Sequence, residues 1–129
     1  MSDADLLEGY VAWVRAVVES GVDSPASRPM QWASDEVDKA VEEHPRRALS
    51  VIAGAVSAAP GDRDLALIAA GPLEDLLCLH GDQIIDEVER LAANDDRFRR
   101  ALSGVWGENR MAPTTRVRVD TALGDMPRL

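Results

Sequence analysis

The stretch from Leu65 to Trp106 carries apolar residues at the three- and four-residue spacing of amphipathic helices. Turn-forming residues interrupt this spacing at Gly71–Pro72, at Gly81–Asp82 and at Asn94–Asp95. The pattern predicts short helices that pack on one another across tight turns. At Gly71–Pro72 it allows either a kink or the start of a new helix. The residues expected at the centre of the core are Leu76, Leu77, Ile85, Val88, Phe98 and Leu102.

Helical spacing with start and stop signals covers most of the chain. Ser2 and Asp5 form a capping-box pattern, and Gly21 is placed to end that first helix. Short loops between successive helices favour a stack of helical hairpins. We therefore expect an all-α fold, a single domain over residues 1–129, with six or seven helices in an irregular HEAT-like or α-α array. The start signals that follow are Pro29 (or Ser34 as an alternative N-cap), Pro45, Asp62, Asp82, Asp95 or Asp96, and Pro113. Pro113 lies in a segment from residue 108 that is either a short helix or a partly ordered tail.

The charge is strongly acidic and unevenly distributed. The formal net charge is -9, which argues against nucleic-acid binding because the phosphate backbone would repel such a surface. Residues 1–96 contain 7 basic and 20 acidic residues, whereas residues 97–129 contain 7 basic and 3 acidic ones. This asymmetry predicts a helical body with an arginine-rich final segment folded back on it. The acidic surface is suited either to solubility or to a basic partner.

Cysteine content and hydropathy indicate the compartment. Cys78 is the only cysteine, so no internal disulfide forms. The first residues are acidic and lack a basic region, and no apolar run approaches 18 residues. We therefore expect no signal peptide, no membrane span and a cytoplasmic location. The preference for arginine over lysine, together with abundant alanine, suggests a GC-rich bacterial genome.

Several phrases resemble a family of small bacterial proteins of unknown function. They are AAGPLEDLL at residues 69–77, His80–Gly81 and FRRALSGVW at residues 98–106, with Trp32 and His44–Pro45 upstream. The resemblance covers about residues 30–106, and the AAGPLEDLL phrase is its most specific part. It implies an α-helical, HEAT-like domain and brings no assigned activity and no catalytic residues.

The residues that could carry chemistry do not form a recognised motif. Glu74 and Asp75 open a helix, where adjacent side chains point about 100° apart and stabilise the helix dipole, or else contact a polar ligand or partner. His80 fits a helix C-terminus and, with Glu74 and Asp75, forms a candidate polar cluster. Cys78 has no histidine at a helical partner offset. With two histidines and no CxxC or HxxxH spacing, we expect no metal, no cofactor and no enzymatic activity.

Large and basic side chains offer further contacts. Trp13, Trp32 and Trp106 are expected to pack between hairpins, and a tryptophan left exposed beside acidic residues would mark a partner surface. Arginines cluster on one helical turn from residue 97 to residue 100. We expect them to pair with Asp95, Asp96 or the acidic body, or else to bind an anionic group; they are Arg97, Arg99 and Arg100.

Two acidic helix faces are the candidate interaction surfaces, with solvated faces as the competing interpretation. Together they favour a non-enzymatic protein-binding module with a basic protein partner, including an immunity-type protein that neutralises a basic toxin or nuclease. A structural or self-assembling subunit and an uncharacterised enzyme are the alternatives, and the oligomeric state stays open. The acidic residues are Asp35, Glu36, Asp38, Glu42 and Glu43 on one helix and Asp86, Glu87 and Glu89 on another.

Overall fold

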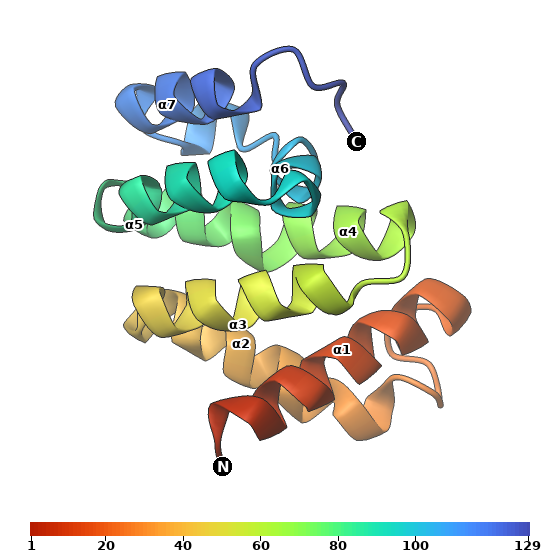
Figure 1. Cartoon of the computed structure of the whole chain (residues 1–129). Helices are drawn as coiled ribbons and strands as arrows, with labels where there is room; N and C mark the ends of the chain where they lie inside the picture. The colour runs from red at the N-terminus through yellow and green to blue at the C-terminus, as the bar shows by residue number, and fades with distance from the viewer.

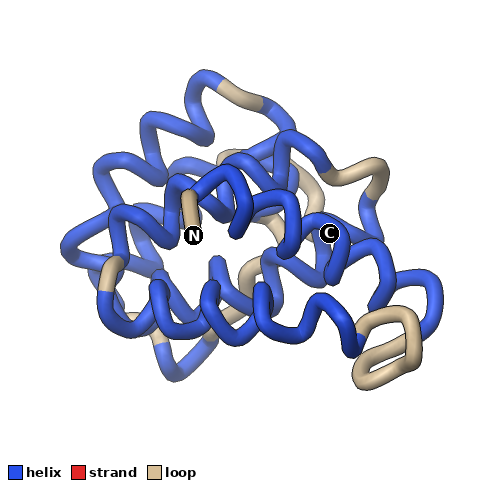
Figure 2. Tube along the Cα trace, turned by 90° about the horizontal axis from the view of Figure 1, so that it is seen from below, coloured by secondary structure: helices blue, strands red, loops and turns tan.

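The chain is helical throughout, as its periodicity predicts. The computed structural model describes all 129 residues except the side chain of Glu108. Within that description there are seven α-helices and no strand (Figure 2). The all-α class and the expected number of helices are thereby confirmed. The α-helices are α1 (Asp3–Ser20), α2 (Gln31–Glu43), α3 (Pro45–Ala58), α4 (Asp62–Ile68), α5 (Glu74–Asn94), α6 (Asp96–Leu102) and α7 (Pro113–Leu123).

The helices stack in the order in which they occur in the chain (Figure 1). α1 packs against α2 and α3, α3 packs against α5, and α5 packs against α6 and α7. The buried apolar residues form one cluster that extends from Leu6 to Leu123. All six residues predicted at the centre of the core are at most 3% exposed. Among the described helices, none combines the length and apolar character needed to cross a membrane.

Several predicted helix ends are confirmed. Ser2 Oγ accepts a hydrogen bond from the Asp5 amide while the Asp5 carboxylate accepts one from the Ser2 amide, and Gly21 ends α1. Asp95 caps α6, because its Oδ1 accepts hydrogen bonds from the amides of residues 97 and 98. Pro113 begins α7, so the final segment forms the short helix rather than a partly ordered tail.

Three predicted helix starts in the first half of the chain differ from the structure. The Ser34 alternative fails because this side chain is buried inside α2. Pro29 instead lies in a 3-10 turn, η1 (Arg28–Met30), that leads directly into α2. Asp62 is the first residue of α4, and Gly61 occupies the N-cap position that Asp62 was expected to fill.

The middle of the chain corrects two predicted boundaries. α4 continues into α5 through a π-helical turn, η2 (Ala69–Leu73), with non-helical torsions at Gly71, so the kink is the correct alternative there. The break predicted at Gly81 lies at His80, where φ is -134° and ψ is 26°, and helical structure resumes without Asp82 as a cap. A Cβ atom on Gly81 would lie 2.6 Å from Thr115 Oγ1. Gly81 therefore allows α7 to approach α5 closely.

Candidate functional site

The arginine-rich final segment neutralises one of the two acidic faces. The Arg118 guanidinium in α7 bonds the carboxylates of Asp86 and Glu89 in α5, with 2.9 Å between Arg118 Nε and Glu89 Oε2. Glu87 pairs with Arg90 one turn along the same helix. The predicted folding-back of the arginine-rich segment is thus observed, and the α5 face has its counter-charges within the chain.

The proposed cluster of Glu74, Asp75 and His80 separates into two structural contacts. Glu74 Oε1 accepts hydrogen bonds from the amides of Trp106 and Gly107, at 3.1 and 3.0 Å. Arg110 joins the Glu74 and Asp75 carboxylates, at 3.3 and 2.9 Å. His80 turns the other way: its Nε2 lies 3.0 Å from the Glu42 carbonyl oxygen, which can only accept. The three residues therefore do not form one site.

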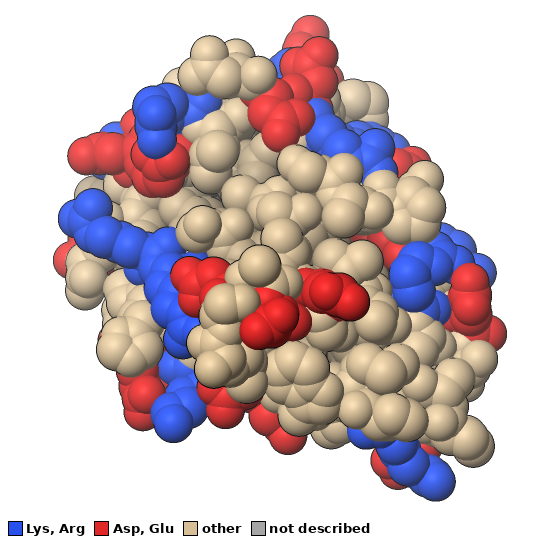
Figure 3. Space-filling model, turned by 60° about the horizontal axis from the view of Figure 1, so that its bottom comes forward, with Lys and Arg blue, Asp and Glu red and all other residues tan. Residues whose placement is uncertain are grey.

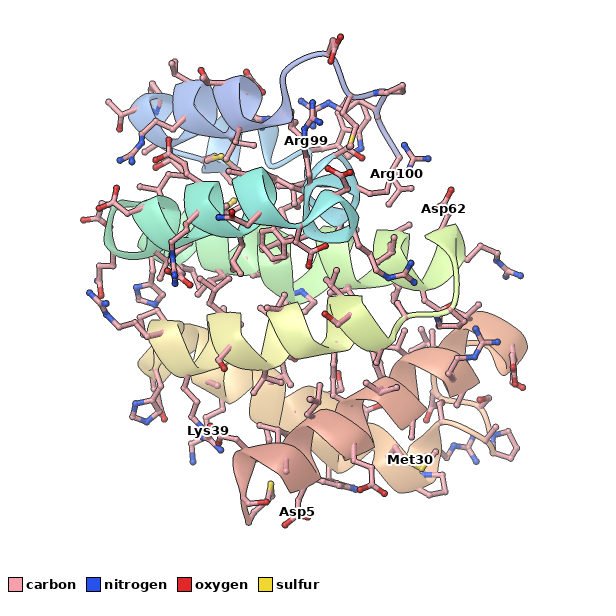
Figure 4. All side chains as sticks on the ribbon, viewed as in Figure 1. Asp5, Met30, Lys39, Asp62, Arg99 and Arg100 are labelled. Atoms are coloured by element: carbon pink, nitrogen blue, oxygen red, sulfur yellow. The ribbon has the colours of Figure 1, made fainter. Side chains whose placement is uncertain are left out.

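The arginines of α6 contact the body and the end of the chain rather than their neighbouring aspartates. Arg97 donates to the Val56 carbonyl, and Arg99 donates to the Leu123 carbonyl. Arg100 donates to the Pro127 carbonyl and pairs with Asp62 at 3.2 Å (Figure 4). The predicted pairing with Asp95 and Asp96 is wrong, because the Asp95 carboxylate is used as the α6 cap; pairing with the acidic body is confirmed for Arg100.

Trp106 is the more exposed of the two surface tryptophans, at 49%. The Arg128 guanidinium nevertheless lies over its ring, 4.8 Å from the ring centroid. The same guanidinium donates to the Val105 carbonyl at 2.7 Å and reaches the Asp120 carboxylate at 3.4 Å. Trp106 thus holds the end of the chain against the body and is already occupied by a cation. Trp13 is half-buried and stacks on Tyr10, with ring centroids 5.8 Å apart.

The α2 face, in contrast, keeps its negative charge. Asp35 accepts a hydrogen bond from Gln31, but none of the five carboxylates predicted on this face is in an ion pair with another described side chain. Burial raises the pKa of Asp38, and the neighbouring carboxylates of Asp75, Asp35 and Glu42 raise it further. Like charges are therefore held together here at some cost in stability.

Trp32 lies at the edge of this acidic region, where α2 meets α1. Its side chain is 41% exposed. A shallow groove of about 330 Å³ runs beside it, lined by Asp5, Glu8, Gly9, Ala12, Met30 and Trp32. Figure 4 shows Asp5 and Met30 on the lower side of the stack. With that side brought forward, acidic side chains cross the middle of a largely uncharged surface and basic ones lie toward its margins (Figure 3).

Gly9 makes the position of the Trp32 ring possible. A Cβ atom on Gly9 would lie 2.6 Å from Trp32 Cζ2 and 3.1 Å from Ala33 Cβ. The indole therefore lies directly on the α1 backbone, with Asp5 and Glu8 on the same helix beside it. Helical spacing does not assign Asp5, Glu8 or Gly9 to a candidate site, and Asp5 is expected only as part of the helix cap. The available signal was Gly9 itself, because a glycine inside a helix costs about 1 kcal/mol relative to alanine and often marks a close approach.

The remaining chemistry-bearing groups do not assemble into a reactive centre. Among the described side chains, no group of three or more His, Cys, Asp or Glu residues is placed to hold a metal ion. Burial raises the pKa of the Cys78 thiol, with a smaller opposing effect from Arg110. A raised thiol pKa reduces the fraction of nucleophilic thiolate. The described surface offers, besides these groups, an acidic groove with an exposed indole.

Comparison with known proteins identifies a family without identifying an activity. A family model matches residues 20–126, and its description is a family of unknown function, DUF6869. The match includes α7, whereas the sequence resemblance was limited to residues 30–106. Neither the curated proteins nor the solved structures give a match to this chain.

Proposed function

Because the chain belongs to DUF6869, a family of unknown function, we propose its function from its own residues: it is a non-enzymatic module that binds a basic protein through the α1–α2 face. This face is defined here by the groove residues Asp5, Glu8 and Trp32 and by the α2 carboxylates Asp35, Glu36, Asp38, Glu42 and Glu43. The carrying observation is the exposed Trp32 indole, framed by carboxylates that no described side chain neutralises.

The charge distribution supports this choice of face. The chain places Arg110 and Arg118 against the acidic residues of α5, so it neutralises that surface itself. Lys39 is the only basic residue of α2. Unneutralised carboxylates attract a positively charged partner and raise the rate of encounter. The α5 face, with its carboxylates paired, offers less of this attraction.

The cost of keeping Asp38 charged also supports a binding role. Partial burial and three neighbouring carboxylates raise the pKa of Asp38, so its charged form is less favoured than that of an isolated aspartate. A cationic partner would relieve that repulsion on binding. Repulsion between like charges that destabilises the free protein, and that a bound ligand would reduce, is typical of a functional surface.

An immunity-type role is the specific form that we propose. The binding of a basic toxin or nuclease would place this acidic face over the positively charged surface that such a protein uses for its own substrate. In that proposal the stacked hairpins present the face in the manner of HEAT-like arrays. A bacterial source and a cytoplasmic location stay predictions. A toxin gene next to the gene for this chain would favour the immunity role, and an operon of metabolic enzymes would count against it.

The test is capture of partners from the native host, followed by titration of the purified partner. The double variant Glu42→Lys with Glu43→Lys reverses charge on the α1–α2 face. A control variant, Asp82→Lys with Asp96→Lys, makes the same change in net charge elsewhere, at exposed positions without a described ion pair. Exposed carboxylates contribute little to stability, so both variants should fold.

We expect a basic partner that the natural chain and the control variant capture at low salt and release as salt is raised. The Glu42→Lys, Glu43→Lys variant should lose it, because rim charges govern association and are screened by salt. Equal binding by both variants, or binding that does not change with salt, would remove the electrostatic proposal.

A further inference from the structure

We propose that the partner inserts an arginine side chain into the α1–α2 groove, with its guanidinium stacked on the Trp32 indole and paired to the flanking carboxylates. The inference rests on the proposed function and specifies the group that the face recognises. It comes from comparing the two exposed tryptophans of this chain, of which one already holds such a cation and the other does not.

At Trp106, an exposed indole near an aspartate binds an arginine of the same chain. Arg128 lies over the ring at 4.8 Å, donates to the Val105 carbonyl at 2.7 Å and reaches the Asp120 carboxylate at 3.4 Å. The site thus combines a ring face, a carbonyl and a carboxylate around one guanidinium. A cation over an indole contributes about 0.5–1 kcal/mol at an exposed site.

Trp32 offers an exposed ring face and neighbouring carboxylates, as Trp106 does, but no arginine is stacked on it in the described part of the chain. Its ring is 41% exposed, and Asp5 and Glu8 line the groove beside it. Asp35 and Glu36 follow on the next turn of α2, where residues three and four positions apart are neighbours on the helix surface. In the described part of the chain, the arginine stacked on a tryptophan is the one at Trp106.

The shape of the groove favours arginine over lysine. The groove is shallow and the indole is 41% exposed, so a planar group can reach the ring without entering a deep pocket. A guanidinium is planar, weakly hydrated and able to bond a carboxylate with two N–H groups. The ammonium group of lysine is compact and strongly hydrated, so it gains less binding free energy from the same ring and carboxylates.

The experiment uses nuclear magnetic resonance of the full chain and three short peptides. The indole N–H groups of Trp13, Trp32 and Trp106 give three signals, and Trp32→Phe assigns the one of interest. The probes are acetylated and amidated Gly-Arg-Gly-Arg-Gly, the lysine equivalent and the citrulline equivalent, which keeps the shape of arginine without its charge. Backbone amides near Gly9 report binding independently.

The arginine peptide should shift the Trp32 indole signal and the Gly9 amide signal. The lysine peptide should bind more weakly, and the citrulline peptide should have no effect. Trp32→Ala should weaken binding of the arginine peptide by about two- to fivefold, the size of an exposed cation–π contact. The Trp106 indole signal should not shift, because Arg128 already lies over that ring. In an Arg128→Ala variant, Trp106 should begin to respond.

The outcomes separate this inference from the function on which it rests. Equal binding of the arginine and lysine peptides, with the Trp32 signal unmoved, would overturn the arginine site while leaving electrostatic binding intact. If Trp32→Ala keeps full affinity for the natural partner but Glu42→Lys with Glu43→Lys loses it, the proposed function survives and the arginine site fails. If neither the arginine peptide nor the lysine peptide binds at low salt, both proposals fail together.

Discussion

Arg118 in α7 lies against Glu89 in α5, 29 residues earlier in the chain, and bonds it through Nε and Nη2. The hydrogen bonds from Arg118 hold the pKa of Glu89 below its ordinary value of 4.5. Because the folded pKa is depressed, the ion pair stabilises the fold above that value, and this stabilisation is lost as the pH falls through the folded pKa.

The pair predicts a change in the acid stability of the fold. Glu89→Gln should lower the melting temperature at pH 7 and should make stability less dependent on pH below 4.5. Thermal unfolding followed by circular dichroism across this range measures both effects. The control is Asp82→Asn, an exposed residue of the same helix. Parallel pH curves for the natural chain and Glu89→Gln would show that the ion pair adds nothing.

The raised pKa of Asp38 predicts a pH dependence of stability opposite to that of Glu89. Burial and the neighbouring carboxylates raise its folded pKa above the ordinary value of 3.8, so the charged form costs stability once the pH rises through the folded pKa. Asp38→Asn should therefore raise the melting temperature at pH 7, and the gain should disappear below about pH 3.8. A lower melting temperature at neutral pH would mean that the Asp38 carboxylate is stabilised by its surroundings instead.

Gly81 should tolerate no side chain. A Cβ atom there would lie 2.6 and 2.7 Å from Oγ1 and Cγ2 of Thr115, a buried and β-branched residue that cannot easily move aside. Gly81→Ala should destabilise the chain by about 1–3 kcal/mol in urea unfolding, despite the higher helix propensity of alanine. Gly61→Ala is the control, because its Cβ would meet open space. Equal stability of the two variants would contradict the close approach of α7.

Two leucines two residues apart in α5 separate core from surface. Leu77 is 1% exposed, whereas Leu79 is 56% exposed. Leu77→Ala should lower the free energy of unfolding by about 2–5 kcal/mol, and Leu79→Ala should change it by less than about 0.5 kcal/mol. Chemical denaturation measures both. A loss below about 0.5 kcal/mol for Leu77→Ala would place that side chain outside the core.

Local signals in the sequence predicted the helices well, because caps and apolar spacing act within a few residues. The Ser2–Asp5 capping box, the Asp95 cap and the start of α7 at Pro113 are found as expected. The sequence favours a helix end at Gly81, because the effect of a glycine on its own backbone is local. Its contact with Thr115 joins residues 34 positions apart, and helical periodicity does not report such separations.

The site was only partly predictable for the same reason. Most of the acidic α2 residues are exposed, as the sequence predicts. The expectation that Trp32 and Trp106 pack between hairpins is wrong, because their side chains are 41% and 49% exposed. The groove beside Trp32 also needs Asp5 and Glu8 from α1, which helical spacing alone does not bring to it. The acidic residues of α5 looked equivalent in the sequence. The ion pairs of Arg118 and Arg90 with the α5 carboxylates distinguish the two faces. Charge counts along a chain do not show which carboxylate meets which guanidinium.

The folding-back of the arginines also sets an order of events during synthesis. A ribosome delivers Glu74, Asp75, Asp86 and Glu89 before it delivers Arg110 and Arg118, which pair with them. A nascent chain that has reached residue 96 carries 20 acidic residues and 7 basic ones, and its emerging helices repel one another. Residues 97–129 then supply seven arginines, and those four α5 carboxylates can form their ion pairs only after Arg110 and Arg118 have been added.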